Sequence, residues 1–403
     1  MPTEPQAARQ PLEGVVVIDL SHIYNGPYAT FLMAMAGATV IKVEPPDGEH
    51  LRLRANLGGA SMPFANLNSN KRTVTLNLKT ERGRALMHEM VAKADVFVEN
   101  FAPGVTDRLG LGAAALQALN PRLVYASSTG FGRSGPFRDY PAMDLTIQAM
   151  SGVMAITGFP DKPPVKAGPA LCDFFGGTHL FGGIMMALYE REKTGVGRVV
   201  EVSMQEAVYA SLSSNLGMYF GRGKRNPPRT GNRHGGLAEA PYNVYPARDG
   251  HIAIICNNNR HFHALLRAME REDLRDDPRF VDLKARIAHI DAVDDLVGRW
   301  TATLDRATLV ERFLAHRVPH APVREIDEVV NDPNMHARGT LKWIDHPEFG
   351  RMVVQHSPIR FEGTPLEPLV PSGRLGEQNA AVFGDWLGLS AAQLDELRAQ
   401  QVI

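Results

Sequence analysis

Short apolar runs alternate with helical patterns through the first half of the chain. Residues 15–20 (VVVIDL) and 39–44 (TVIKVE) are rich in β-branched side chains and predict buried strands, with a small-residue helical segment between them. Strands that alternate with helices favour a parallel sheet whose ligands bind at the carboxyl ends of the strands. The pattern therefore predicts an α/β fold, with further strands at residues 73–78, 95–99 and 123–127.

The most strongly specified segment lies further along the chain. A helical pattern follows Asp173 and runs to Lys193, and the glycines of residues 194–197 (TGVG) end it. Residues 198–202 predict another strand. Residues 203–206 (SMQE) then form a capping box, in which serine and glutamate side chains satisfy the first backbone N–H groups of a helix.

The pattern changes after residue 220. Residues 221–234 are rich in Gly, Arg, Pro and Asn and indicate a linker. A hairpin pattern and helical patterns follow, so we expect residues 225–330 to form a smaller α+β domain, separate from a large domain that begins with residues 1–220. Residues 331–403 contain a strand pair and a last helix, and we expect this segment to return to the large domain because terminal segments usually need a surface to dock on.

Composition narrows the class of protein. The 403 residues are 44% hydrophobic, which is enough for a large core. The 43 Lys and Arg residues nearly balance the 44 Asp and Glu residues, so the net charge does not favour binding to nucleic acid or to an anionic membrane. Two cysteines, Cys172 and Cys256, give neither a disulfide framework nor metal-ligand spacing, which fits a reducing cytoplasm and predicts no metal site. Residues 1–10 lack the apolar core of a signal peptide, and we expect no membrane-spanning run.

Asp173 is the main chemical candidate, and it has two interpretations. Asp is a favoured helix N-cap, and the local pattern alone favours that role. The alternative is a carboxylate nucleophile at a helix start, where Gly176 and Gly177 allow close approach and nearby N–H groups stabilise an oxyanion. Cys172 is a competing nucleophile, but His179 is too far along the chain to be its obvious base, and a free cysteine is usually a small buried apolar residue.

Two other motifs have ordinary explanations. Residues 130–135 (GFGRSG) match GxGxxG after a strand, but Pro136 and the polar residues after it do not open a helix, so we interpret the motif as a loop. A nicotinamide-dependent oxidoreductase stays a weak alternative on this motif. Asp144 starts a helical run and is an N-cap first and a substrate-site carboxylate second.

Several basic and glycine-containing segments could face a substrate. Residues 70–72 (NKR), Lys79 and Arg108 are solvated surface charges by default, with phosphate binding as the alternative. His22, in the first strand-helix turn, is more often a structural histidine than a catalytic one. The tentative substrate contacts are Arg52 and Arg54, in a polar aperiodic stretch over residues 45–70, and Gly235 and Gly236, which form either a mobile glycine loop or an ordinary turn.

The order of these motifs resembles the family III CoA-transferases, the group that includes formyl-CoA transferase and the carnitine CoA-transferase family. The likeness covers nearly the whole chain. The matching segments are residues 17–21 with 26–27, 37–44, 68–72, 94–101, 119–123, 148–152, 168–180, 191–195 and 203–208.

This resemblance implies a fold and a reaction. The fold would be two interlocked ring-like subunits, a homodimer, each with a Rossmann-like large domain built from both chain ends and a small domain between them. Asp173 would attack an acyl-CoA thioester to give a mixed anhydride, and the CoA thiolate would return to form an aspartyl-CoA thioester that a carboxylic acid then attacks. Acyl-CoA and the acid are substrates, and no tightly bound cofactor is implied.

The resemblance also implies a set of CoA contacts. Formyl-CoA transferase has an arginine where Pro45 stands and a glutamine where Tyr24 stands, so nucleotide binding and small-oxyacid specificity depart from that enzyme at these positions. The contacts carried over to this chain are His22, Ile23, Tyr24, Asn25, Leu76, Lys79, Asn100, Phe101 and Arg108.

The related acyl-CoA racemases supply the main alternative function. They carry a His-Asp pair where this chain has Met143 and Asp144, and two-base proton transfer needs both partners, so we favour CoA transfer over racemisation or isomerisation. After the nicotinamide-dependent oxidoreductase, a non-catalytic CoA-binding or scaffold protein is the fourth hypothesis. We expect no nucleic-acid partner.

Overall fold

The computed structural model describes residues 9–54 and 61–403, so residues 55–60 of the loop expected over residues 45–70 lie outside the described residues. The chain divides into two compact units. The first consists of the residues up to Ile147, Pro169–Val208 and Val330–Ile403, and the second of Gln148–Gly168 and Tyr209–Val329. The first unit thus receives both ends of the chain, and its central segment ends at Val208, earlier than residue 220.

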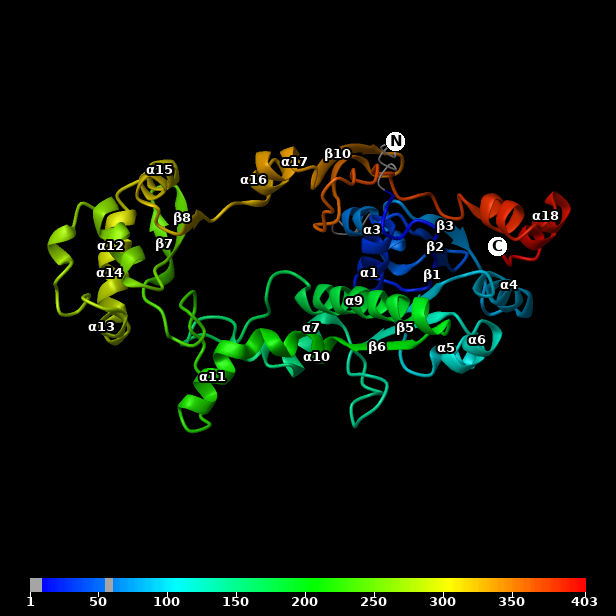
Figure 1. Cartoon of the computed structure of the whole chain (residues 1–403), viewed down its shortest axis with the longest axis horizontal. Helices are drawn as coiled ribbons and strands as arrows, with labels where there is room; N and C mark the ends of the chain where they lie inside the picture. The colour runs from blue at the N-terminus through cyan, green and yellow to red at the C-terminus, as the bar shows by residue number, and fades with distance from the viewer. Residues whose placement is uncertain (1–8, 55–60) are drawn as a thin grey trace, which may run out of the picture. The chain divides into compact units, whose positions relative to one another are not determined.

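A six-stranded parallel sheet forms the centre of the first unit (Figure 1). The strand order is β3-β2-β1-β4-β5-β6, so the order reverses beside β1, where ligands of such sheets bind. The predicted α/β class is therefore confirmed. The strands are β1 (Val16–Asp19), β2 (Thr39–Glu44), β3 (Arg72–Thr75), β4 (Val96–Glu99), β5 (Val124–Thr129) and β6 (Val199–Ser203).

Helices cover both faces of this sheet, which explains why its strands are apolar on both sides. On one face Val17 and Val96 pack with side chains of α1 (Asn25–Ala34) and α9 (Leu171–Thr194). On the other face Ile18 and Phe97 pack with side chains of the C-terminal segment and of two further helices. These elements are α4 (Glu81–Val91), α6 (Ala113–Leu119), the π-helix η3 (Ala380–Trp386) and α18 (Ala391–Ala399).

The remaining elements of the first unit are short. The predicted strand pair in the C-terminal segment is confirmed as an antiparallel hairpin of β10 (Leu341–His346) and β11 (Gly350–Gln355). The C-terminus also reaches the sheet edge, where Asn77 N–H donates to the Val402 carbonyl at 2.8 Å. The other helices are α2 (His50–Leu53), α3 (Ser61–Asn68), α5 (Val105–Arg108), α7 (Asp144–Met150), which begins in this unit, α10 (Met204–Tyr209) and α17 (Pro333–Ala337).

The second unit is built on a three-stranded antiparallel sheet of β7 (Tyr242–Ala247), β8 (Gly250–Ile255) and β9 (His320–Pro322). Its core joins Ile252 and Ile254 of β8 to side chains of α12 (Asn259–Ala268), α14 (Ile290–Thr301) and α15 (Arg306–His316). It is a small α+β unit. Its shorter helices are α8 (Val153–Ile156), η1 (Ala210–Leu212), α11 (Ser213–Gly221), η2 (Glu272–Leu274), α13 (Leu283–Ala288) and α16 (Ile326–Val330).

Two glycines let α9 lie directly against the start of α1. A Cβ placed on Gly176 would lie 2.2 Å from Asn25 Nδ2, and one on Gly177 would lie 2.4 Å from the Asn25 carbonyl oxygen. Both distances are shorter than any ordinary carbon contact. The two glycines of α9 therefore allow the close approach of another helix, α1.

The helix α9 is long and apolar enough to cross a membrane by length and composition, so the expectation that no run meets this criterion was wrong. Its apolar residues have a different explanation in the structure. Leu180 and Ile184 belong to the apolar cluster between α9, α1 and the central sheet. This packing is that of the core helix of a globular unit.

Candidate active site

Asp173 lies in the first turn of α9, which begins two residues earlier, at Leu171. The N-cap position is Ala170, and the predicted capping role of Asp173 is therefore wrong. Asp144 provides that interaction instead, because its Oδ1 accepts hydrogen bonds from the N–H groups of Cys172 at 2.8 Å and Asp173 at 3.3 Å. A carboxylate 29 positions earlier in the sequence thus stabilises the N-terminus of α9.

The Asp173 carboxylate accepts no hydrogen bond from any described residue, although only 9% of the residue is exposed. Burial raises its pKa to about 7, and the charge of Asp144 adds to the shift. An ionised carboxylate in this setting is poorly solvated, which increases its reactivity toward an electrophilic carbon. Asp173 is therefore equipped to act as a nucleophile.

Cys172 is not a competing nucleophile. Its side chain is fully buried, and burial raises the pKa of the thiol to about 12, with the charges of Asp144 and Asp173 acting in the same direction. The thiol is protonated at neutral pH and is a weak nucleophile. His179 is engaged elsewhere, since its Nδ1 lies 2.8 Å from the Phe175 carbonyl oxygen.

Three of the predicted CoA contacts meet where the strand order reverses. His22 N–H donates to Asn100 Oδ1, and Asn100 Nδ2 donates to the His22 carbonyl, both at 2.8 Å. The His22 ring contacts Phe101 edge-on at 5.2 Å between ring centres. These reciprocal bonds join the turn after β1 to the end of β4. Burial lowers the pKa of His22 to about 3, so its ring is neutral at physiological pH.

A cavity of about 430 Å³ opens beside this junction, at the carboxyl ends of β1 to β4. Its lining includes His22, Pro45, Leu76, Lys79 and Phe101, so the structure brings four of the predicted CoA contacts together. Arg108 lies in α5, next to the lining residue Leu109. Lys79 and Arg108 are exposed and make no ion pair within residues 9–54 and 61–403.

Ile23, Tyr24 and Asn25 continue from this turn into α1. Ile23 has a left-handed backbone, with φ of 67°, and its N–H donates to Glu49 at 3.4 Å. The side-chain amide of Asn25 is buried against Gly176 and has no hydrogen-bond partner in the described part of the chain. The three residues therefore connect the cavity to the helix start that carries Asp173.

The basic segment at residues 70–72 is not a phosphate site at Lys71. Its Nζ is buried and pairs with Asp19 Oδ2 at 2.9 Å, and Lys42 is buried beside the same carboxylate. Burial lowers the pKa of Lys71 to about 8 against the opposing effect of Asp19. Burial alone would raise the pKa of Asp19, but Lys71 and Lys42 hold it well below its usual value. This cluster fixes the end of β1. The sequence signal for this cluster was the presence of Asp19 and Lys42 inside apolar strand runs.

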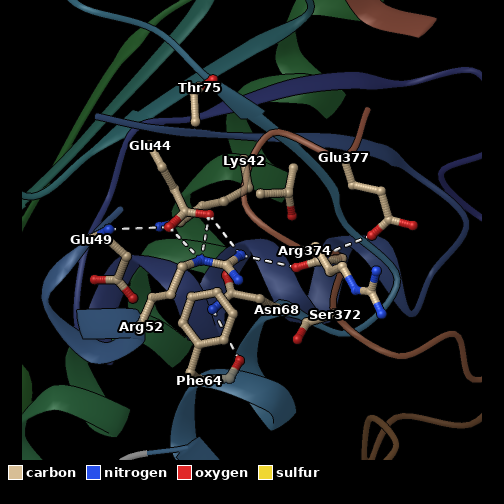
Figure 2. A network of polar contacts seen from close by, with 12 residues as sticks. Lys42, Glu44, Glu49, Arg52, Phe64, Asn68, Thr75, Ser372, Arg374 and Glu377 are labelled. Atoms are coloured by element: carbon tan, nitrogen blue, oxygen red, sulfur yellow. Dashed lines mark hydrogen bonds and ion pairs between the residues drawn. The ribbon is translucent and has the colours of Figure 1, made fainter. Parts of the chain in front are cut away.

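Arg52 is held in a polar network (Figure 2). Its guanidinium donates to Glu44 at 2.9 Å, to Glu348 at 3.1 Å and to the Gly373 carbonyl at 2.9 Å, and it lies over the Phe64 ring at 4.2 Å. These contacts use the Nε, Nη1 and Nη2 donors of Arg52, so the side chain is not placed to bind a substrate carboxylate. Its role is structural, and it joins the loop after β2 to the C-terminal segment.

We expect Arg52→Ala to lower the free energy of unfolding by about 3 kcal/mol, because it leaves Glu44 buried without its charge partner. Arg54→Ala is the matched control. Arg54 is exposed, its side chain makes no ion pair or hydrogen bond with a described residue, and its removal should change stability by less than about 0.5 kcal/mol. Urea denaturation measures both, and equal effects would show that the network does not stabilise the fold.

The tentative substrate glycines lie in the second unit. Gly236 N–H donates to His234 Nδ1 at 3.2 Å, and the Gly235 carbonyl accepts from Asn215 Nδ2 at 3.4 Å. These bonds form an ordered turn. The GxGxxG match at residues 130–135 is also a loop, as expected, and the next helix begins only at Asp144. Within the described residues no group of three or more His, Cys, Asp or Glu side chains is arranged to hold a metal.

The strand order around β1 and the carboxylate at the start of α9 together define an α/β enzyme of the Rossmann-like class. The sequence matches CoA-transferase family III over residues 12–379, and the chain belongs to that family. It is an enzyme that transfers CoA between acids, and CoA thioesters are its substrates. The resemblance noted from the motifs is confirmed.

Three similar proteins illustrate the relationship. The chain is 40% identical to the acetyl-CoA:oxalate CoA-transferase of Acetobacter aceti, covering 94% of this chain and 97% of that protein. It is 35% identical to the succinyl-CoA–D-citramalate CoA-transferase of Chloroflexus aurantiacus, covering 99% of each. The crystal structure of a CAIB/BAIF family protein from Brucella suis superposes with a TM-score of 0.82 at 34% identity, covering 94% of this chain and all of that one.

Proposed function

We propose that this enzyme moves CoA from an acyl-CoA thioester to a carboxylic acid through a covalent aspartyl-CoA intermediate on Asp173. The observation that carries the proposal is the state of that carboxylate, which is buried at a helix start without a hydrogen-bond partner among the described residues. The named relatives act on oxalate and citramalate, so we propose a small dicarboxylic acid as the acceptor.

The proposed steps balance without an external acid or base. An Asp173 oxygen attacks the thioester carbon and the C–S bond breaks. CoA leaves as the thiolate, and a mixed anhydride of Asp173 and the donor acyl group remains. The thiolate then attacks the Asp173 carbonyl carbon and releases the donor acid as its carboxylate. The acceptor carboxylate attacks the aspartyl-CoA thioester, and the returning thiolate takes the acceptor acyl group and frees Asp173.

The test of this route is to trap the intermediate. The enzyme is mixed with acyl-CoA without acceptor, quenched in acid and digested, and the peptide containing Asp173 is examined by mass spectrometry. We expect the mass of CoA less one water on that peptide, and its loss on addition of acceptor. Transfer at full rate with no adduct on Asp173 would contradict the proposal.

The raised pKa of Asp173 predicts the pH dependence of the reaction. The nucleophile is the ionised form, so kcat/KM of the free enzyme should be level above about pH 7 and fall about tenfold for each pH unit below it. The apparent pKa at which kcat/KM falls is measured from a pH-rate profile, with a CoA thioester that has no titrating group in this range. An apparent pKa near 4, the range of an ordinary carboxyl group, would contradict the assignment to Asp173.

We propose that the nucleotide end of CoA binds in the cavity lined by His22, Leu76 and Phe101, with Lys79 and Arg108 facing its phosphates. Lys79→Ala should raise KM for acyl-CoA about tenfold at low salt, with kcat unchanged, because a charge-assisted contact contributes about 1.5 kcal/mol. Lys284→Ala, at another exposed lysine, is the control and should leave KM unchanged. Steady-state kinetics at two salt concentrations compare the variants.

Two further assignments, the oligomeric state and the location, complete the proposal. We propose a homodimer, checked by light scattering, and a cytoplasmic location, checked by cell fractionation. Racemisation or isomerisation remains the alternative activity. It would incorporate deuterium from solvent at the α-carbon of an acyl-CoA without any added acid, and CoA transfer alone would not.

A further inference from the structure

The four N–H groups that open α9 are all occupied. Leu171 N–H donates to the Pro169 carbonyl at 2.9 Å, and Phe174 N–H donates to the Ala170 carbonyl at 3.2 Å. Those of Cys172 and Asp173 donate to Asp144 Oδ1. The backbone donors that the sequence suggested for an oxyanion are therefore already used, and the reacting carbonyl next to Asp173 needs another donor.

A tyrosine side chain lies beside this helix turn. The Tyr24 ring stacks on Phe174, the residue after Asp173, with ring centres 5.9 Å apart and planes inclined by 18°. Tyr24 is partly exposed, and its hydroxyl makes no hydrogen bond within residues 9–54 and 61–403. The hydroxyl is thus a free donor at the edge of the candidate site.

Tyr28 provides an internal comparison. It lies one helical turn further along and contacts the same Phe174 ring edge-on, at 4.9 Å between ring centres. Burial raises the pKa of both tyrosines, but the charge of Asp173 raises only that of Tyr24. The Tyr24 hydroxyl is therefore the one of the two that lies in the field of the proposed nucleophile.

We propose that the Tyr24 hydroxyl is a catalytic hydrogen-bond donor to the acyl carbonyl oxygen when Asp173 attacks, an inference that rests on the proposed function. As the new C–O bond forms, the carbonyl π electrons move onto that oxygen, and the Tyr24 hydrogen bond stabilises the resulting charge. When the C=O bond re-forms, the C–S bond breaks and CoA leaves as the thiolate. Tyr24 keeps its proton throughout.

Tyr24→Phe tests this role because it removes the hydroxyl and keeps the stacked ring. We expect kcat to fall about 100- to 1,000-fold, the usual effect of losing one oxyanion donor, with KM for acyl-CoA and Tm unchanged. Tyr28→Phe removes the equivalent hydroxyl from the other ring on Phe174 and should change kcat less than twofold. Single-turnover formation of the CoA adduct should slow to the same extent as kcat in Tyr24→Phe.

The other outcomes each overturn the inference. A kcat within about threefold of the unaltered enzyme in Tyr24→Phe shows that the hydroxyl is not used, and so does a change in KM alone, since a transition-state contact acts on kcat. Equal losses in Tyr24→Phe and Tyr28→Phe show an effect of packing. Asp173→Ala separates this failure from that of the proposed function. If Asp173→Ala is inactive and Tyr24→Phe is fully active, only the role of Tyr24 is lost.

Discussion

Replacing Asp173 with asparagine should abolish CoA transfer and make the protein more stable at alkaline pH. The amide has nearly the same shape but cannot form the covalent intermediate, so the rate should fall about 10⁴- to 10⁶-fold, as when other enzymes lose their nucleophile. The effect on stability follows from the raised pKa of the native carboxyl group, about 7 against its ordinary value of 3.8.

The sign of the stability effect can be worked out from proton binding. Between about pH 4 and pH 7 the folded protein holds a proton on Asp173 that the unfolded chain has lost, so stability decreases as pH rises through this range. Above pH 7 Asp173 is ionised in both the folded and the unfolded state. The buried charge then destabilises the fold by its full amount, and this amount no longer changes with pH. Asp173→Asn never acquires this charge and should be about 2–4 kcal/mol more stable than the original protein at pH 8, with the difference vanishing below pH 4.

Urea denaturation at pH 8 and pH 5, with transfer assays on the same preparations, checks both results. Asp161→Asn is the control, because that side chain is 74% exposed and should affect neither activity nor stability. An Asp173→Asn variant that is inactive but less stable than the original at pH 8 would mean that the ionised carboxylate stabilises the fold. Such a result would contradict the destabilising effect that we assign to the buried, unpartnered carboxylate of Asp173.

The second large effect is expected at Gly177. A Cβ there would lie 2.4 Å from the Asn25 carbonyl oxygen, a backbone atom that cannot move without shifting α1. Gly177→Ala should lower the free energy of unfolding by about 2 kcal/mol, because overpacking outweighs the gain in helix propensity of about 1 kcal/mol. Since Asp173 lies one turn away on the same helix, a shift of about 1 Å should also reduce kcat about 100-fold.

Gly182→Ala is the matched control on the same helix. A Cβ at Gly182 would have no neighbour within 4 Å, so only the helix propensity changes and the variant should gain about 0.5–1 kcal/mol. Thermal and urea denaturation distinguish the two substitutions. If both glycines behave alike, the close contact between α1 and α9 does not control the position of Asp173.

The alternation of strands and helices was predictable because it depends on local periodicity, and β1, β2 and α9 follow it closely. The partners of charged side chains were not predictable in the same way. Asp144 reaches α9 across 29 positions and Lys71 reaches Asp19 across 52, and no local pattern encodes such pairings. Asp173 was therefore assigned as a cap from its neighbours alone, and only the order of motifs along the whole chain indicated a nucleophile.

The return of residues 330–403 to the first unit affects how the protein folds during synthesis. Arg52 pairs with Glu348, and Asn77 bonds to Val402, one residue before the end of the chain. A nascent chain on the ribosome therefore has β2 and β3 available long before their C-terminal partners emerge, while residues 209–329 can already collapse as a nearly contiguous unit. The sheet edge at β3 therefore stays uncovered until residues 378–379, which bond to Thr73 and Thr75, have been synthesised. An unpaired strand edge on an incomplete chain is prone to aggregate during this interval.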